Sequence, residues 1–486
     1  MSNENIAIEF SRPVKLAYGL GQLGDAIVHF SFETLIFFYY TQVLGISGSL
    51  AGLAVFVALV FDALSDPLIG SLSDSTRGRL GRRHPFMFAG PLPLAVCFYL
   101  LFVSPENLGE AGLFVWLTGF SILARTFLTL FSVPYMSLGA ELSQDYVGRT
   151  WIVATRMSFG AIGWIGAAAV AFFGFFRSTE EYPVGHMNPE PYSLFAFCLA
   201  LTIALVQMAS AAGTLGPAQT LRVMGNPEPF RPARVFGELR AAFGQQSFRW
   251  FAIGGVIAAG ALGVRQTLVL HMNTFFWDFS SEETGTVMVV TLVGLLGGFP
   301  FWAWLSNRIE KRRVFQAGLW MLGLCVLLPP LLRAFDYFPE NESKALIVPA
   351  VALFSLLSAL GGTGAQLAQG SMAADIADES ALATGLRQEG IFFGSVNVLV
   401  KCSSGLGHQL AGILLDVIGL RATAKPGEVS ERVVADLGWA YGIGVFAVAV
   451  VAAWAIGRYR LDKERVAEIQ RELSKRAESH AIPISG

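Results

Sequence analysis

The sequence predicts an all-α membrane protein with twelve transmembrane helices arranged in two pseudo-symmetric six-helix bundles. Hydrophobic residues make up 53% of the 486 residues, charged residues only 14%, and the mean hydropathy is +0.54. This composition is typical of polytopic membrane proteins and excludes an ordinary soluble domain. The sequence lacks the alternating pattern of barrel strands, and helices satisfy their own backbone hydrogen bonds in lipid.

Twelve segments are long and apolar enough to cross a bilayer, since a spanning helix needs about 20 largely apolar residues. The predicted spans are residues 16–44, 48–72, 84–104, 112–138, 150–175, 192–215, 248–277, 284–305, 313–335, 344–373, 388–418 and 433–457. The first, seventh and tenth segments are long, which suggests broken helices. All four cysteines lie inside predicted spans, where we expect packing residues rather than a disulfide framework.

Basic residues gather between spans 2 and 3, 6 and 7, and 8 and 9, and again after span 12. With twelve spans, these four segments all fall on the same side of the membrane. The positive-inside rule makes that side cytoplasmic, so we expect both termini inside, in a plasma membrane such as a bacterial inner membrane. Residues 458–486 then form a cytoplasmic tail with a short helix.

A polar, proline-bearing stretch at 216–247 divides the chain into a bundle over 1–215, a cytoplasmic linker and a second bundle over 248–457. The second span of each half is followed by a similar basic turn, Leu72-Ser73-Asp74 to Arg82-Arg83 and Leu305-Ser306-Asn307 to Arg312-Arg313. The repetition indicates a duplicated architecture. Such repeats are typical of secondary transporters, whose substrate site lies between the halves near the midplane.

Two carboxylates, Asp62 and Asp66, interrupt the second span, and their spacing of four places them on one face of a helix. An ionisable group at membrane depth is costly and marks a functional site. Two negative charges held this close need a cation or a proton. Oxygen ligands suit a hard cation, and no Cys/His cluster indicates a transition metal. Lys401 lies deep in the eleventh span, and we expect it to seek one of these carboxylates.

The first span carries a hydrophilic stripe, because Tyr18, Gln22, Asp25, His29 and Glu33 recur at spacings of three or four. Two interpretations are open. The groups either pair with one another against neighbouring helices, or they form the wall of a water-filled cavity where substrate groups or protons dock. Three ionisable residues in one stripe favour the cavity wall.

The basic turn after the second span serves most simply as an anchor and topology device. We also expect it to form a conformational gate on the cytoplasmic side. The basic run from Arg77 to Arg83, and Arg82 in particular, would pair there with Asp74 or Glu141 when that side of the protein closes. This role is conformational and involves no substrate.

Several motifs form a specific set that spans essentially the whole chain. They are Lys15-Leu16-Ala17-Tyr18-Gly19, Asp62-Ala63-Leu64-Ser65-Asp66-Pro67 with Arg79-x-Gly81-Arg82, Pro134-Tyr135 with Leu138-Gly139-Ala140-Glu141-Leu142, Ala374-Asp375-Ile376-Ala377-Asp378, Thr384-Gly385-x-Arg387-x-Glu389-Gly390, and Lys401. In these motifs the chain resembles the glycoside–pentoside–hexuronide:cation symporter family, the melibiose-permease-like branch of the major facilitator superfamily. The resemblance implies the major facilitator fold, alternating access, and transport coupled to Na⁺, H⁺ or Li⁺.

The resemblance also implies a cation site for Na⁺ or H⁺ at Asp62, Ser65, Asp66 and Thr129, with Lys401 as a coupling residue nearby. Ser65 stands where the sodium-coupled sugar transporters of that family have asparagine, so the ion preference stays open.

The implied sugar site matches less well. The family's sugar-binding aspartate on span 4 falls at Ser132, its stacking tryptophan falls at Met136, and its first-span aspartate aligns beside Asp25. Arg156 does match the family's span-5 arginine. We expect the substrate-binding residues to be Tyr18, Asp25, His29, Ser132 and Arg156.

The expected function is cation-coupled symport of a polar organic solute, either a sugar, a glycoside or a sugar acid. One alternative is a sodium-coupled carrier of lysolipid or another amphiphile, because the same superfamily branch contains such carriers. Another is a membrane sensor that binds a solute without moving it. An intramembrane enzyme is disfavoured, since no nucleophile motif or metal cluster accompanies His29 and Glu33. We expect a monomer with a small-molecule substrate, no cofactor beyond the coupling ion, and no nucleic-acid partner.

Overall fold

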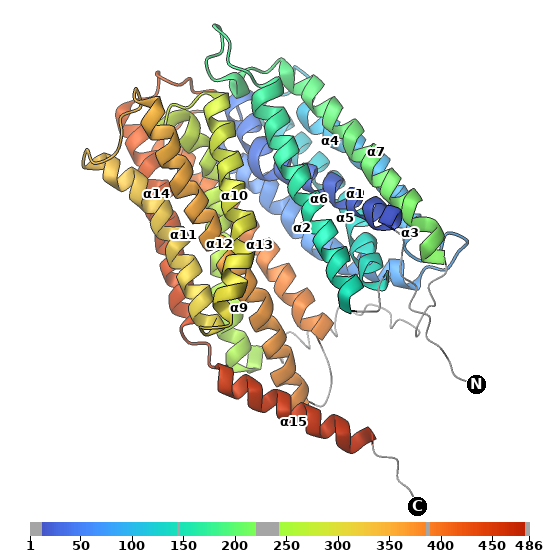
Figure 1. Cartoon of the computed structure of the whole chain (residues 1–486). Coiled ribbons are helices and arrows are strands. Elements are labelled where there is room, and N and C mark those ends of the chain that lie inside the picture. Colours follow the sequence, from blue (N-terminus) through green and yellow to red (C-terminus); the bar gives the residue numbers. More distant parts are fainter. Residues whose placement is uncertain (1–11, 143–145, 220–242, 385–388, 482–486) are drawn as a thin grey trace, which may run out of the picture. The chain divides into compact units, whose positions relative to one another are not determined.

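The computed structural model describes residues 12–142, 146–219, 243–384 and 389–481, and all regular elements within these ranges are helices (Figure 1). Residues up to 219 form α1 (Arg12–Phe30), η1 (Ser31–Ile36), η2 (Tyr39–Val43), α2 (Gly48–Ser75), α3 (His84–Ala89), α4 (Pro91–Phe102), α5 (Glu110–Glu141), α6 (Tyr146–Ala169), η3 (Val170–Phe175), η4 (Gly185–Met187) and α7 (Pro191–Gln219). The remaining residues form α9 (Gln246–His271), η5 (Met272–Phe276), α10 (Ser281–Ser306), α11 (Lys311–Ala334), α12 (Lys344–Thr384), α13 (Glu389–Ile418), α14 (Glu431–Ile456) and α15 (Lys463–Ala481).

Eleven helical segments in the described ranges are long and apolar enough to cross a membrane, and they coincide with predicted spans 2 to 12. The first predicted span, 16–44, is helical through α1, η1 and η2 but is not among the eleven, because polar residues recur along it. The four cysteines are free, as predicted. Most of the predicted linker at 216–247 lies outside the described residues, as do Gly385 and Arg387.

The chain forms two compact units, and their limits differ from those of the predicted bundles. The first unit comprises Met1–Phe230, Gln266–Val289 and His408–Val434, and the second comprises Arg231–Arg265, Val290–Gly407 and Ala435–Gly486. One end each of α9, α10, α13 and α14 therefore belongs to the first unit. The predicted bundle limits at 215 and 248 stay predictions.

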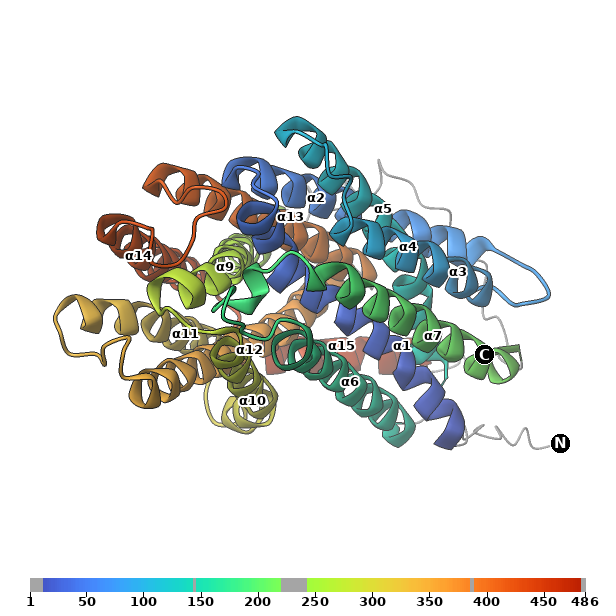
Figure 2. The ribbon, with the colours of Figure 1, turned by 90° about the horizontal axis from the view of Figure 1, so that it is seen from above.

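Within the first unit, α1 packs along α6 and α7, and α2 packs along α5 (Figures 1 and 2). The helix that begins at α1 continues through two π-helical turns, η1 and η2. Ser31 donates to the carbonyl of Ile27 and Thr41 to the carbonyl of Phe37, each at 3.0 Å. These hydroxyls donate to carbonyl oxygens four residues earlier, and such side-chain hydrogen bonds compete with the regular backbone hydrogen bonds of the helix. Single π turns are frequent at functional sites.

The start of α2 is fixed by a residue far along the chain. Asp416 of α13 accepts hydrogen bonds from the backbone N–H groups of Gly48 and Ser49, both at 2.8 Å. A carboxylate at a helix N-terminus satisfies free N–H groups and interacts favourably with the helix dipole. Gly48 and Gly412 allow this close approach, since a Cβ atom on Gly48 would lie 2.5 Å from the Gly412 carbonyl oxygen.

In the first unit, His186 in η4 also forms hydrogen bonds with residues far away in the sequence. Its ring nitrogens lie 2.8 Å from the hydroxyls of Ser281 and Thr274, and Tyr192 donates to its carbonyl oxygen at 2.7 Å. Burial lowers the pKa of His186 to about 3. The imidazole is therefore neutral near pH 7, with one nitrogen donating and the other accepting.

In the second unit, α11 packs along α12, and α15 packs against the same core. The buried side chains there include Val314, Phe315, Met372, Tyr459 and Ile469. Ile469 belongs to the amphipathic α15, whose apolar face thus has a partner within the unit. The predicted helix after the last span is confirmed, and its cytoplasmic location stays a prediction.

Replacing Gly412 by alanine should lower the thermal unfolding temperature of the detergent-purified protein. The new Cβ would collide with the backbone of Gly48, and an overpacked contact costs about 1–3 kcal/mol. Gly444→Ala is the matched control, because a Cβ at Gly444 has no heavy atom within 4 Å and alanine favours a helix. Equal unfolding temperatures for Gly412→Ala and wild type would contradict the role assigned to this contact.

Candidate cation and substrate sites

Asp62 and Asp66 lie one turn apart on α2, as their spacing predicts, and Thr129 of α5 joins them. The Thr129 hydroxyl lies 2.8 Å from Oδ1 of Asp62 and 3.1 Å from Oδ1 of Asp66. A hydroxyl has one proton and can donate it to only one carboxylate at a time. The shared hydroxyl therefore leaves a compact group of oxygens that carries the charge of two carboxylates.

The backbone of α2 adds a further oxygen to this turn. Pro67 lies inside the helix directly after Asp66, and proline has no N–H to bond to the carbonyl of Ala63. Ser65, the third residue predicted on α2, donates its hydroxyl proton to the carbonyl of Asp62 at 3.0 Å. Its oxygen keeps its acceptor capacity, but its proton is directed at the helix backbone.

The donor set consists of carboxylate, hydroxyl and carbonyl oxygens, which suits a hard cation. Within the described residues, no three His, Cys, Asp or Glu side chains are grouped so as to hold a metal ion. The oxygens around Asp62 and Asp66 thus fit Na⁺, Li⁺ or a proton better than a transition metal.

Arg125 is a member of this cluster that the sequence did not place there. Its Nη1 lies 3.4 Å from Oδ2 of Asp62, and both side chains are less than a tenth exposed. Arg125 precedes Thr129 by four residues, so both lie on one face of α5. The spacing of four could have linked Arg125 to Thr129 in the sequence. That the shared face lies against Asp62 depends on how α5 packs against α2.

The predicted stripe on the first helix is a chain of polar contacts. Gln22 donates to Asp25 at 3.0 Å, and the ring nitrogens of His29 lie 3.7 Å from Asp25 and 3.7 Å from Glu33. Gln266 of α9 donates to Glu33 at 3.1 Å. The His29 side chain nevertheless keeps 44% of its surface exposed. Internal pairing and exposure therefore occur together along this stripe.

The other predicted substrate residues lie in different surroundings. Tyr18 is buried and stacks on Tyr135 with ring centroids 4.4 Å apart, so its ring is part of the packing. Arg156 donates to the sulfur of Met136 at 2.8 Å. Ser132 is half-buried on α5, one turn before Met136. Lys401 lies on α13 in the second unit, and its predicted pairing stays a prediction.

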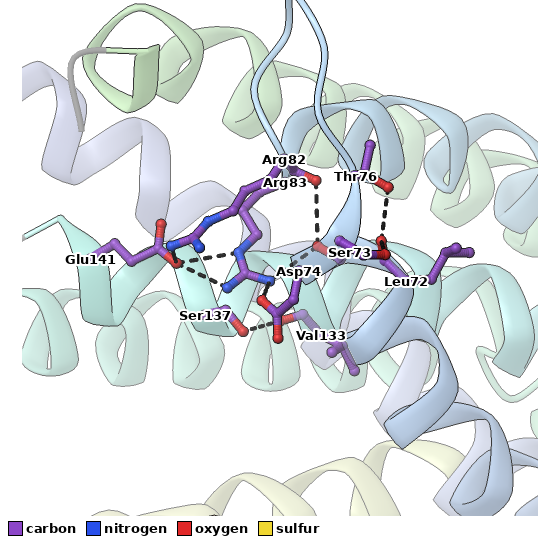
Figure 3. Close-up of polar contacts among 10 residues, drawn as sticks. Leu72, Ser73, Asp74, Thr76, Arg82, Arg83, Val133, Ser137 and Glu141 are labelled. Carbon is purple, nitrogen blue, oxygen red and sulfur yellow. Dashed lines mark hydrogen bonds and ion pairs between the residues drawn. The ribbon is translucent and has the colours of Figure 1, made fainter. Parts of the chain in front are cut away.

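The residues predicted to form a gate are brought together in the first unit (Figure 3). Arg82 donates to Glu141 at 2.8 Å, and Arg83 donates to the same oxygen at 2.9 Å. Arg83 also pairs with Asp74 and donates to Ser73 at 3.1 Å. Arg83 is thus the residue that bridges the two carboxylates. It belongs to the basic run predicted to pair with them, within which Arg82 was singled out.

The second unit contains a corresponding ion pair. Lys311 is the first residue of α11, and its ammonium group lies 2.8 and 2.7 Å from the two carboxylate oxygens of Asp375 on α12. Arg83 similarly directly precedes α3 and pairs with Glu141 at the end of α5. This recurrence supports the duplication inferred from the two basic turns.

Comparison with known proteins gives three findings. A family model described as MFS/sugar transport protein matches residues 17–463. The putative glycoside/cation symporter YagG of Escherichia coli (strain K12) is 23% identical to this chain, and the match covers 96% of each protein. The sphingosine-1-phosphate transporter MFSD2B of Mus musculus is 24% identical, and the match covers 87% of this chain and 84% of MFSD2B. The solved nucleoside transporter NupG has a TM-score of 0.60 at 15% identity, covering 92% of this chain and 99% of that chain, which shows a shared fold.

Arg83→Gln should lower the thermal unfolding temperature of the purified protein, because it leaves Asp74 and Glu141 without their shared guanidinium. We expect a loss of about 1–3 kcal/mol, less than for a fully buried pair, since these carboxylates are 39% and 23% exposed. Arg77→Gln, on the exposed turn of the same segment, is the charge-matched control. If both variants unfold at the same temperature, the bridging role of Arg83 is wrong.

Proposed function

Because this chain belongs to the MFS/sugar transport protein family, we propose that it is a cation-coupled symporter of a polar organic solute. The solute would be a sugar, a glycoside or a sugar acid, carried by alternating access. Family membership makes the protein a multi-pass membrane transporter rather than an enzyme, with the major facilitator fold. The expected resemblance to the melibiose-permease-like symporters is confirmed by this membership and by relatives such as YagG.

The observation that carries the coupling is the Thr129 hydroxyl shared between Asp62 and Asp66. A monovalent cation or a proton beside these oxygens would offset the repulsion between two carboxylates on one helix turn. The same ion would hold α2 against α5, since its ligands come from both helices. An ion with different affinity for two conformations shifts the population between them. We propose that the bound ion favours the substrate-competent, outward-facing state.

The solute would bind along the exposed part of the first helix. Asp25 and His29 offer a carboxylate and an imidazole for hydroxyl groups, and Arg156 offers a guanidinium for hydroxyl or carboxylate oxygens. Ser132 adds a hydroxyl on α5. Tyr18 would support this surface from its buried side, because its ring is buried against Tyr135. In this proposal Lys401 is the coupling residue, and both termini lie in the cytoplasm.

A second candidate is a sodium-coupled carrier of lysolipid or another amphiphile. The contact between Arg156 and the sulfur of Met136 supports it, since a cationic group beside an apolar side chain suits a ligand with an anionic head and an apolar tail. The relative MFSD2B is itself named as a transporter of sphingosine-1-phosphate. Competition by lysolipids, without competition by glycosides, would favour this candidate.

Asp66→Asn should abolish ion-driven accumulation of solute in proteoliposomes, because it removes one of the two charges that require the cation. The assay compares uptake of labelled glycosides, hexuronates and lysolipids with an inward Na⁺ gradient, with an inward proton gradient, and with neither. Wild type should concentrate one solute class under one gradient. The variant should only equilibrate it.

The matched control is Glu106→Gln, which removes an exposed carboxylate between α4 and α5. It should accumulate solute as the wild type does. Ion-independent accumulation that survives in Asp66→Asn would overturn the coupling proposal. Solute binding by wild type without any flux would instead indicate a sensor.

A further inference from the structure

Residues from both halves of the sequence meet in the first unit, at the helix ends opposite the basic turns. The unit includes Gln266–Val289 and His408–Val434 from the later half. Asp416 binds the start of α2 there, and Glu282 of α10 accepts hydrogen bonds from the backbone N–H and the hydroxyl of Ser178 at 2.9 and 2.7 Å. Under the proposed alternating access the two halves move against each other, so these contacts would have to break and form again.

His186 forms a complete hydrogen-bond network across this contact. Thr274 donates its hydroxyl proton to the carbonyl of Leu270 at 2.8 Å, so its oxygen accepts from Nε2 of His186. Nε2 therefore carries the imidazole proton, and Nδ1 accepts the proton of the Ser281 hydroxyl. The Ser281 oxygen in turn accepts the backbone N–H of His186 at 2.9 Å. The network thus fixes one neutral tautomer of His186.

A second proton on the His186 ring does not fit this network. It would bind to Nδ1 and point at the oxygen of Ser281, which would have to turn its own proton away. His186, Ser281 and Thr274 are fully buried, and the rings of Phe38 and Phe172 pack against the imidazole with centroids 5.2 and 5.7 Å away. A charged imidazole is therefore disfavoured while the contact is closed. The burial that lowers the pKa of His186 to about 3 agrees with this conclusion.

The titratable groups that act on His186 come from α7, α9 and α10. Tyr192 of α7 donates to its carbonyl oxygen, and a tyrosine titrates only near pH 10. Besides burial, His271 of α9 lowers the pKa of His186 and Glu282 of α10 raises it. A carboxyl with an ordinary pKa of about 4.3 is largely ionised at pH 5.5, whereas a histidine is not neutral there. A test must therefore separate His186 from His271.

We propose that His186, Ser281 and Thr274 form a proton-sensitive latch between the two halves of the protein. Neutral His186 holds the helix ends closed. A proton on its ring favours the open state, in which Ser281 and Thr274 have moved away and water surrounds the imidazolium. This inference rests on the alternating access of the proposed function. It adds a proton-binding group outside the cation site, through which acidity at the ends opposite the basic turns favours opening.

The test measures hydrogen exchange at the amides of Ser178 and His186, which donate across the contact to Glu282 and Ser281. Purified full-length protein in lipid nanodiscs, without solute, is exchanged at pH 7.5 and at pH 5.5. Each rate is divided by that of an unstructured peptide of the same sequence at the same pH. Because an exposed imidazole has a pKa of about 6.5, the ratio of open to closed protein should rise about tenfold between these pH values. The protection of both amides should fall by that factor.

His186→Gln keeps a donor and an acceptor but cannot titrate, so the protection of its Ser178 amide should be the same at both pH values. His186→Asn is a second neutral variant, and thermal unfolding shows which variants are folded. His271→Gln should respond to pH as wild type does. His84→Gln should too, and it is the matched control, because that buried histidine contacts the hydroxyl of Thr214 at 3.0 Å within the first half of the sequence.

The latch is wrong if wild-type protection is equal at both pH values, if a folded neutral variant at 186 responds as wild type does, or if His271→Gln loses the response. Failure of the proposed ion coupling has a different signature. Wild type and Asp66→Asn would then share the pH response at the Ser178 amide, while wild type accumulates no solute under either a Na⁺ or a proton gradient.

Discussion

Like charges held close together in a weakly polar interior must be compensated, and this constraint governs the contact between α2 and α5 in the first unit. Asp62 and Asp66 both lie on α2, so α2 alone cannot neutralise them. Two partners come from α5: Arg125 places a positive charge beside Asp62, and the Thr129 hydroxyl forms a hydrogen bond with these carboxylates. The state of the charge cluster and the packing of α2 against α5 are therefore linked. The proposed ion coupling needs such a link, because ion binding would have to change which conformation is favoured.

Charges at helix ends recur elsewhere in the protein. Asp416 binds the N-terminus of α2, Arg83 joins the start of α3 to the end of α5, and Lys311 joins the start of α11 to α12. Several of these groups are partly exposed, so water can replace their partners at modest cost. Contacts of this kind hold one conformation and can still be broken, as the proposed alternating access requires.

Much of the fold could be predicted from the sequence, because hydropathy and helix length decide which segments span a membrane. The shared face of Asp62 and Asp66 followed from their spacing alone. The bridging role of Arg83 did not, since Gly81 adopts a φ of +75° and thereby redirects the turn that carries both arginines. The bond between Gln266 and Glu33 joins residues 233 positions apart. The role of Arg125 likewise depended on tertiary packing that no local pattern contains.

The central claim is that the oxygens of Asp62, Asp66 and Thr129 bind the coupling ion. Its most direct test is the charge movement recorded when reconstituted protein, without substrate, meets a sudden rise in Na⁺ or proton concentration. Wild type should give a saturable transient current, and so should the control Thr118→Val, because the Thr118 hydroxyl donates to the carbonyl of Phe114 on its own helix. Thr129→Val should lose most of it. A wild-type-sized current in Thr129→Val, or none in wild type for either ion, would contradict the claim.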